Sequence, residues 1–168
     1  MDEQRFEIFY RRTASGLWSY LYRMTGDAAA ADDLLQKSFF RFLRANPALE
    51  SEEHMRRWMF RTATNLALDH FREAKRERTR TEETIRGEAG THMESREVLR
   101  HDMMKVFTEL KPQERALLWL AHVEEANHAD IGDALGLGTK SVKVMLFRAR
   151  KRLGELLTKK GLAPEVTR

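Results

Sequence analysis

The sequence predicts an all-α protein made of two small helical domains joined by a flexible linker. Three observations predict it: apolar residues recur every three or four positions, only three prolines interrupt the chain, and no run alternates apolar and polar residues. With 168 residues, of which 42% are hydrophobic, the chain is long enough for one domain or two small ones. We expect domains over residues 1–78 and 96–168, with residues 79–95 as the linker.

The first predicted domain holds three helices, over residues 4–24, 28–44 and 52–76. Each helix carries an apolar stripe at helical spacing, which we expect to be buried against the other two helices. Gly16 lies inside the first helix, and the sequence there allows either a straight or a kinked helix. The expected core stripes of the second and third helices are Leu35, Phe39, Phe42, Leu43, and Met55, Trp58, Met59, Thr62, Ala63, Leu66.

The expected linker lies in a stretch with mixed charge and few apolar residues. Between residues 72 and 96, Ile85 and Met93 are the only large apolar side chains, and two glycines interrupt the segment. Such a segment cannot bury enough apolar surface to offset the entropy lost on ordering. We therefore place a flexible domain boundary here.

The second predicted domain has four helices, and the last two form a helix-turn-helix over residues 127–153. Asn127 suits the N-cap of the first of these helices, with Asp130 in the capping-box position. The sequence Gly136-Leu137-Gly138 ends that helix, and Thr139 begins the next. In a helix-turn-helix, the second helix is the one that enters a DNA groove.

That second helix also carries the strongest concentration of positive charge. Residues 139–160 contain eight Lys or Arg and one Glu, although the whole chain has a net charge of only +4. A concentrated basic face on a helix-turn-helix predicts contact with DNA phosphates. A solvated amphipathic helix at the end of a bundle is the alternative. The residues on the basic, partly apolar face are Lys140, Ser141, Lys143, Val144, Phe147, Arg148 and Lys151.

Two further groups of residues in the first domain indicate binding. Adjacent Asp32 and Asp33, followed by Gln36, can grip arginines of a partner, although acids in a first helical turn often only complement the helix dipole. Around Asn65, aromatic, amide and basic groups lie on one long helix, a combination that suits unstacked bases. Trp58 lies on the apolar stripe of this helix, so packing in the core is the alternative to contact with a base.

In this order and spacing, these three groups resemble RNA polymerase sigma factors of the extracytoplasmic-function class, within the sigma-70 family. The segment GDAAAADDLLQKSFFRFLR, residues 26–44, is similar to the core-binding motif of the family. The segment RRWMFRTATNLALDHFR, residues 56–72, is similar to its promoter-melting segment. Residues 110–153 resemble its C-terminal pattern, which includes V-K-x-x-L-x-R-A-R.

The resemblance implies a sigma factor, which binds core RNA polymerase, directs promoter-specific transcription initiation and is not itself an enzyme. It implies a role for each of three sets of residues. Those expected to contact the clamp helices of the polymerase β′ subunit are Asp32, Asp33, Leu35 and Gln36. Those expected at the −10 element are Arg56, Arg57, Arg61 and Asn65. Those expected at the −35 element are Lys140, Ser141, Lys143, Phe147 and Arg148.

The resemblance also implies the partners: the β′ and β subunits of core polymerase, promoter DNA, and an anti-sigma factor that covers both helical domains. Among the departures from the family pattern, three residues bear on the expected contacts. Lys37 stands where Glu is usual, beside the core contact. Val144 and Met145 replace small polar or basic residues, so they cannot donate to base edges but can pack on thymine methyl groups.

Composition excludes several other classes of protein. The chain has no cysteine, and His122 and His128 have no acidic ligand set beside them, so we expect neither a metal site nor a cofactor. No apolar run approaches the roughly twenty residues of a membrane span, and the polar start MDEQR does not resemble a signal peptide. We expect a cytoplasmic protein without direct membrane contact.

Two alternative functions remain at this stage. One is a conventional helix-turn-helix regulator whose N-terminal domain serves dimerisation or ligand binding. The other is a protein-interaction module that has no nucleic-acid function. The regulator predicts a stable homodimer that binds palindromic DNA without polymerase, and the interaction module predicts binding that salt does not weaken.

Overall fold

The computed structural model describes residues 1–80 and 95–162, and within them it contains seven helices and no strand. The all-α prediction is confirmed. Residues 79 and 80 end one helix and residue 95 begins the next, so residues 81–94 of the expected linker lie outside the described part of the chain. The helices are α1 (Glu3–Thr25), α2 (Ala28–Ala45), α3 (Glu52–Arg80), α4 (Ser95–Glu109), α5 (Pro112–His122), α6 (His128–Leu135) and α7 (Thr139–Lys159).

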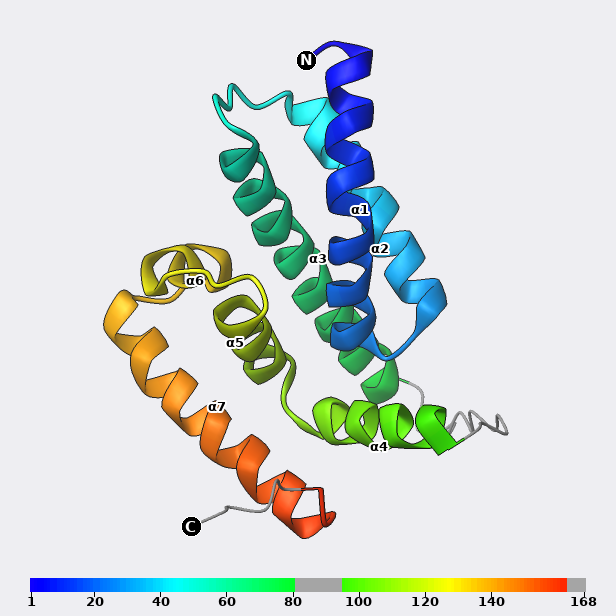
Figure 1. The fold of residues 1–168 in the computed structure, drawn as a ribbon, viewed down its shortest axis with the longest axis vertical. Coiled ribbons are helices and arrows are strands. Elements are labelled where there is room, and N and C mark those ends of the chain that lie inside the picture. The colour runs from blue at the N-terminus through cyan, green and yellow to red at the C-terminus, as the bar shows by residue number, and fades with distance from the viewer. Residues whose placement is uncertain (81–94, 163–168) are drawn as a thin grey trace.

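Helices α1, α2 and α3 form an antiparallel bundle in which each packs on the other two (Figure 1). Polar caps fix where the first two helices begin: Asp2 accepts from the Arg5 amide, and Asp27 accepts from the amides of the first turn of α2. Gly26 lets the chain reverse between them, because it adopts the left-handed φ of 69° that side chains disfavour. The bundle core is aromatic at one end, where Phe9 packs against Phe42.

The buried stripe of α2 is only partly the expected one: Phe39 and Phe42 are buried as predicted, whereas Leu35 is half-buried at the edge of the core. Leu34 is 3% exposed, whereas Leu43, expected in the core, is 53% exposed. The buried face of α2 passes through Ala31, Leu34, Ser38 and Phe42, which leaves Leu43 beyond its edge. On α3, Trp58 is only half-buried and packs edge-on against Phe42.

One buried polar contact fixes α1 on α3. The Thr64 hydroxyl donates to the Phe60 carbonyl at 2.6 Å, so the Tyr20 hydroxyl, 2.7 Å away, donates to Thr64. Burial raises the pKa of Tyr20 above its ordinary value, so the phenol stays neutral. Helix α1 continues unbroken through Gly16, where a side chain would begin 3.4 Å from Nη2 of Arg56. Gly16 therefore causes no break, and a methyl group in its place would only touch the end of the Arg56 side chain.

In the second half, α6 and α7 form the predicted helix-turn-helix, packed on α5. Asn127 is the N-cap of α6, as predicted, and its Oδ1 accepts from the Asp130 amide at 2.8 Å. Gly136 ends α6 with a left-handed φ of 68°. Helix α5 begins at Pro112, a residue that suits the first turn because it has no amide hydrogen to satisfy.

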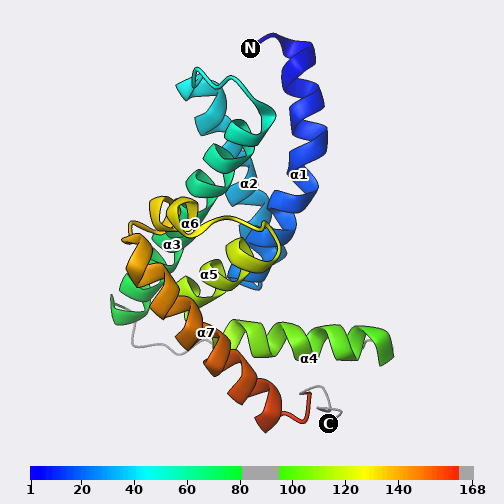
Figure 2. The same ribbon diagram turned by 60° about the vertical axis from the view of Figure 1, so that its left-hand side comes forward.

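The two halves dock on each other and share one core. Buried Leu120, Ile131 and Ala134 from the second half belong to the same apolar cluster as the core of the first. The rings of Tyr20 and Trp119 meet with their centroids 5.9 Å apart. Helix α5 accordingly lies against α1 and α3 and helix α6 lies against α3, while α7 packs on α4, α5 and α6 and not on the bundle (Figure 2).

Arg115 on α5 is a buried charge that joins the two halves. Its guanidinium donates to the carbonyls of Leu110 at 3.0 Å, Thr108 at 2.6 Å and Met24, the last across the junction. It also lies over the ring of Phe71, 5.3 Å from the centroid. Burial lowers the pKa of Arg115, but the carbonyls at the C-terminal ends of α1 and α4 favour the cation.

Candidate nucleic-acid and partner interfaces

The outer side of α7 forms an exposed face that is basic and partly apolar. All five residues expected at the −35 element are exposed on it, whereas Val142, Leu146 and Ala149 are buried. Val144 and Phe147 add apolar surface to this face, with exposed fractions of 50% and 67%. The expected residues are Lys140, Ser141, Lys143, Phe147 and Arg148.

Met145 does not belong to this face. It is half-buried and packs against the core, because successive residues of an α-helix point about 100° apart, which turns Met145 inward from the side that Val144 occupies. Of the two apolar departures noted in the sequence, only Val144 therefore points outward with the basic residues. Its position on the helix places it one turn before Arg148 and three residues before Phe147.

The residues expected to contact polymerase lie on the outer side of α2. Asp32 accepts a hydrogen bond from the Trp18 indole at 2.7 Å, and Asp33 forms an ion pair with Lys37 at 2.8 Å. Gln36 is exposed between them, while Leu35 is half-buried at the edge of the core. The same side continues into Phe40 and Leu43, two exposed apolar residues that were not predicted as polymerase contacts.

The structure divides the set of residues expected at the −10 element. Arg56 and Asn65 are nine residues apart, which is two and a half helical turns, so they lie on opposite sides of α3. Arg56 forms a bidentate pair with Glu124 and Arg57 pairs with Asp130, both toward the helix-turn-helix half. Asn65 is exposed on the side of α3 that faces α2.

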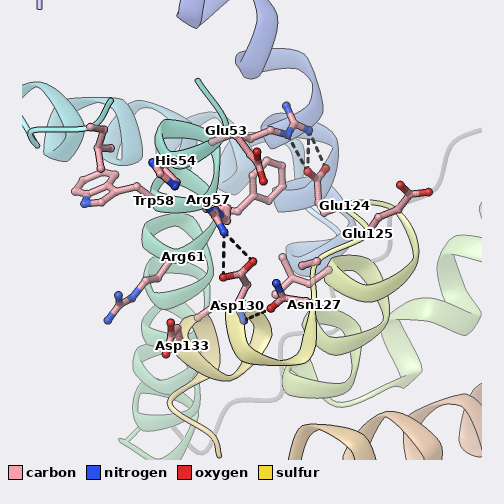
Figure 3. Close-up of a pocket in the computed structure, with 16 residues that line it drawn as sticks. Glu53, His54, Arg57, Trp58, Arg61, Glu124, Glu125, Asn127, Asp130 and Asp133 are labelled. Carbon is pink, nitrogen blue, oxygen red and sulfur yellow. Dashed lines mark hydrogen bonds and ion pairs between the residues drawn. The ribbon is translucent and has the colours of Figure 1, made fainter. Parts of the chain in front are cut away.

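A cavity of about 400 Å³ lies between α3 and the segment that leads into α6. Figure 3 shows it, with the side chains of Arg57 and Asp130 meeting across the junction and Arg61 pointing away from them. Its lining is strongly charged: three arginines come from α3 and four carboxylates from the second half, and Arg56 and Arg57 pair with two of these carboxylates. These residues are Arg56, Arg57, Arg61, Glu124, Glu125, Asp130 and Asp133.

A second cavity, of about 470 Å³, opens on the other side of α3. Asn65, Thr62 and Trp58 from α3 line it together with Arg41 and Arg44 from the end of α2. These two arginines are not among the site residues predicted from the sequence, because only the antiparallel packing of α2 on α3 brings the end of α2 beside the middle of α3. Both are exposed, and neither forms an ion pair in the described part of the chain.

Residues 1–80 and 95–162 hold no candidate metal site and no candidate membrane-spanning helix. Among these residues, no three His, Asp or Glu side chains gather in a way that could hold a metal ion. No helix of the described chain combines the length and the apolar character that a membrane crossing requires. The exposed charged and apolar faces are thus the features that indicate function.

Comparison with known proteins connects both halves to one family. The profile described as "Sigma-70 region 2" matches residues 9–77, and "Sigma-70, region 4" matches residues 100–153. The ECF RNA polymerase sigma factor SigM of Bacillus subtilis is 30% identical over 156 residues, covering 88% of this chain and 91% of SigM. The RNA polymerase sigma factor CarQ of Myxococcus xanthus is 26% identical, covering 92% of this chain and 90% of CarQ.

A solved structure shares the fold across almost the whole chain. It is the sigma factor RpoE of Bartonella quintana, crystallised in complex with the anti-sigma factor NepR. The TM-score is 0.78 at 19% identity, and the match covers 98% of this chain and 99% of RpoE. The likeness therefore extends over both helical halves.

Fold and surface define an all-helical DNA-binding protein with a helix-turn-helix at its C-terminal end. The likeness to SigM covers nearly the full length of both proteins and identifies the family: the chain belongs to the extracytoplasmic-function class of RNA polymerase sigma factors in the sigma-70 family. It directs transcription initiation by RNA polymerase at promoters, and the members of this family are not enzymes as a class. A conventional helix-turn-helix regulator is not favoured.

Proposed function

We propose that three separate faces of this sigma factor divide its work among polymerase, the −10 element and the −35 element. The division follows the expected domains, with polymerase and −10 contacts in residues 1–78 and −35 contacts in residues 96–168, joined through residues 79–95. The observation that carries the proposal is the cavity where Asn65, Trp58 and two arginines meet. It combines a polar edge, an aromatic ring and positive charge at one exposed place.

The outer side of α2 is the proposed contact for the β′ clamp helices. Asp32 is held in place by the Trp18 indole, so its second oxygen remains available to a partner's arginine. The ion pair with Lys37 partly neutralises Asp33, a feature that follows from the departure from Glu at position 37. Exposed Phe40 and Leu43 extend this face with apolar surface that a helix of the partner can cover.

The cavity beside Asn65 is the proposed site for an unstacked base of the −10 element. Holding a flipped base costs a few kcal/mol in lost stacking, which an aromatic ring and amide hydrogen bonds can offset. Trp58 and Asn65 provide these groups. Arg41 and Arg44 at the rim provide the phosphate contacts, so we assign the backbone of the melted strand to them in preference to the paired Arg56 and Arg57.

Salt dependence tests this assignment. In the complex with core polymerase, Arg41→Ala and Arg44→Ala each should reduce the log–log salt slope of binding to a single-stranded −10 oligonucleotide by about 0.7, because each removes one phosphate contact. Arg11→Ala, at an exposed ion-paired site on α1, is the matched control and should leave the slope unchanged. Fluorescence anisotropy at several salt concentrations measures the slopes. A reduced slope for Arg56→Ala but not for Arg41→Ala would place the strand on the opposite side of α3.

The exposed face of α7 is the proposed reader of the −35 element. Lys140, Lys143 and Arg148 provide charge for phosphates and base edges, while Val144 and Phe147 provide apolar contact. Thymine is the base that presents a methyl group in the major groove, so these two side chains favour thymine over the other bases. The −35 sequence read by this chain should therefore include thymines within reach of Val144 and Phe147.

Replacing thymine by deoxyuridine removes the methyl group and leaves every hydrogen-bonding group in place. At −35 positions contacted by Val144 or Phe147, this change should weaken duplex binding by about 1 kcal/mol for each methyl group lost. At the positions contacted by Val144, Val144→Ser should lose that sensitivity, whereas Lys143→Ala should weaken both duplexes equally. Equal affinity of the unmodified chain for the thymine and deoxyuridine duplexes at every −35 position would contradict the methyl contact. Competition binding with the polymerase complex provides the measurement.

The remaining assignments follow from membership of the family. The chain is proposed to act in the cytoplasm, where core polymerase is found, without a cofactor and without an enzymatic activity of its own. An anti-sigma factor is the proposed inhibitory partner. The match to a sigma factor whose solved structure includes the anti-sigma factor NepR supports this proposal.

A further inference from the structure

Asp32 and Asp33 of α2 are neighbours in the sequence but have different partners in the structure. Oδ1 of Asp32 accepts a hydrogen bond from the indole Nε1–H of Trp18 at 2.7 Å, a contact between α2 and α1. Oδ2 of Asp33 lies 2.8 Å from Nζ of Lys37, one turn further along α2. Asp32 is therefore hydrogen-bonded to a neutral group, whereas Asp33 is paired with a cation.

Neither acid is required to begin α2. Asp27 is the N-cap, and its Oδ1 accepts from the amides of Ala29 and Ala30 at 2.9 and 3.3 Å. Asp32 and Asp33 lie in the second turn, and no acid lies in the first turn of α2. The favourable effect of a helix dipole on an acid falls off within that first turn. Stabilisation of the helix end therefore does not account for the two acids.

The indole that binds Asp32 is itself held in place. Its ring stacks on that of Tyr22, with centroids 5.1 Å apart and planes inclined by 13°. Both rings are half-buried and pack against the core of the bundle. Since Trp18 and Tyr22 are four residues apart on α1, one turn of a single helix provides the stack. A hydrogen-bond donor on so restrained a ring limits the directions that the Asp32 carboxylate can take.

A restrained carboxylate is a better acceptor for a partner than a freely rotating one. A side chain that is already ordered loses less rotamer freedom when a partner binds. An ionised carboxylate has about four lone-pair sites on its two oxygens, so one indole hydrogen bond leaves room for a guanidinium. Asp33, by contrast, must share its oxygens with Lys37 or give up that pair when a partner's cation arrives. Of the two acids, Asp32 is therefore the stronger acceptor.

We propose that Trp18 is a positioning residue for polymerase binding: it presents the Asp32 carboxylate to a guanidinium of the partner, while Lys37 weakens Asp33 as an acceptor. The inference rests on the proposed function, because it takes the outer side of α2 as the polymerase contact. It extends that contact, expected on α2 alone, to a residue of α1. Arginine is the expected partner residue, since its planar guanidinium matches the geometry of a carboxylate.

A double-mutant cycle on the full chain with core polymerase tests the positioning role. Trp18→Phe keeps an aromatic ring beside Tyr22 but removes the indole N–H, so binding to core should weaken about fivefold. Asp32→Ala removes the charged acceptor itself and should weaken binding about thirtyfold. Once Asp32 is gone, adding Trp18→Phe should change the affinity by less than about twofold, because the two residues act as one unit. Titration of the fluorescently labelled chain with purified core measures the dissociation constants.

Asp33 offers the matched control. Asp33→Ala removes an acid at the adjacent position, and because Lys37 already compensates its charge, the loss in affinity should be no more than about threefold. In that background, Trp18→Phe should still weaken binding about fivefold. An equal effect of Trp18→Phe with and without Asp32, or no effect at all, would overturn the positioning role. A larger loss from Asp33→Ala than from Asp32→Ala would overturn it equally.

The indole N–H resonances give a readout that does not depend on polymerase. The Nε1–H of Trp18 donates to a carboxylate, so Asp32→Ala should move its proton resonance upfield, whereas Asp33→Ala should leave it in place. The buried Nε1–H of Trp119 has no acceptor in the described part of the chain and serves as the internal reference. An unchanged Trp18 resonance in the Asp32→Ala chain would show that the hydrogen bond is absent in solution.

Failure of the inference is distinguishable from failure of the proposed function. If Asp32→Ala and charge reversal at Asp33 both left binding to core unchanged, the outer side of α2 would not be the polymerase contact. Independent, additive losses from Trp18→Phe and Asp32→Ala would instead refute the positioning role of Trp18 alone. The polymerase contact on α2 would stand in that case.

Discussion

An Asp33→Arg chain should fail to initiate transcription at every promoter that the unsubstituted chain uses, with transcript yield reduced by at least about a hundredfold. Asp33 is exposed on the outer side of α2, where the proposed contact with the β′ clamp helices lies. Reversal of its charge would place an arginine against the partner's basic groups and would also repel Lys37. Run-off transcription with purified core, together with co-elution of the chain with core, measures the effect.

Glu7→Arg is the control for this charge reversal. Glu7 forms an exposed i,i+4 ion pair with Arg11, just as Asp33 does with Lys37, but it lies on α1 away from the proposed contact. The two substitutions therefore remove the same kind of pair and change the net charge equally. Normal transcription by the Asp33→Arg chain, or an equal loss in both, would show that the outer side of α2 does not bind polymerase.

Arg115→Met should destabilise the chain by about 3 kcal/mol, because it leaves three carbonyl groups without their donor in a buried place. These carbonyls belong to Met24, Thr108 and Leu110, so the loss affects the ends of two helices and the junction between the halves. Methionine retains most of the side-chain length, which limits the contribution of an empty cavity. Urea unfolding followed by circular dichroism measures the difference.

The matched substitution is Arg150→Met on α7. Arg150 is exposed and donates to Nε2 of His122 at 3.0 Å, so its removal should change stability by less than about 0.5 kcal/mol. If Arg115→Met were as mild as Arg150→Met, the buried guanidinium would not be what joins α1, α4 and α5. The two unfolding curves decide this without any assay of function.

Most helices and their ends could be predicted because their signals are local. Asn127 and Gly136 bound α6 by capping and by a left-handed backbone, and both effects depend on neighbouring residues alone. The buried residues of α2 could be predicted only in part. Leu34 and Leu43 are equally apolar, and only the position of α3 and α1 around the helix decides which of them is buried.

The candidate site was predictable in its parts but not in its assembly. Grouping Arg56 with Asn65 overlooked the helical period, which already places residues nine apart on opposite sides. The contribution of Arg41 and Arg44 depends on how α2 packs on α3, and the pairing of Arg56 with Glu124 joins residues 68 positions apart. Exposed charges carry no sequence signal that selects one distant partner over another.

The core shared by the two halves has a consequence for the chain before it meets polymerase. Separation uncovers Leu120, Ile131 and the ring of Trp119, which now face the N-terminal bundle. Uncovered apolar surface of this kind favours self-association of protein chains. Docking of the two halves therefore keeps this apolar surface out of water, where it would otherwise favour contact between copies of the chain.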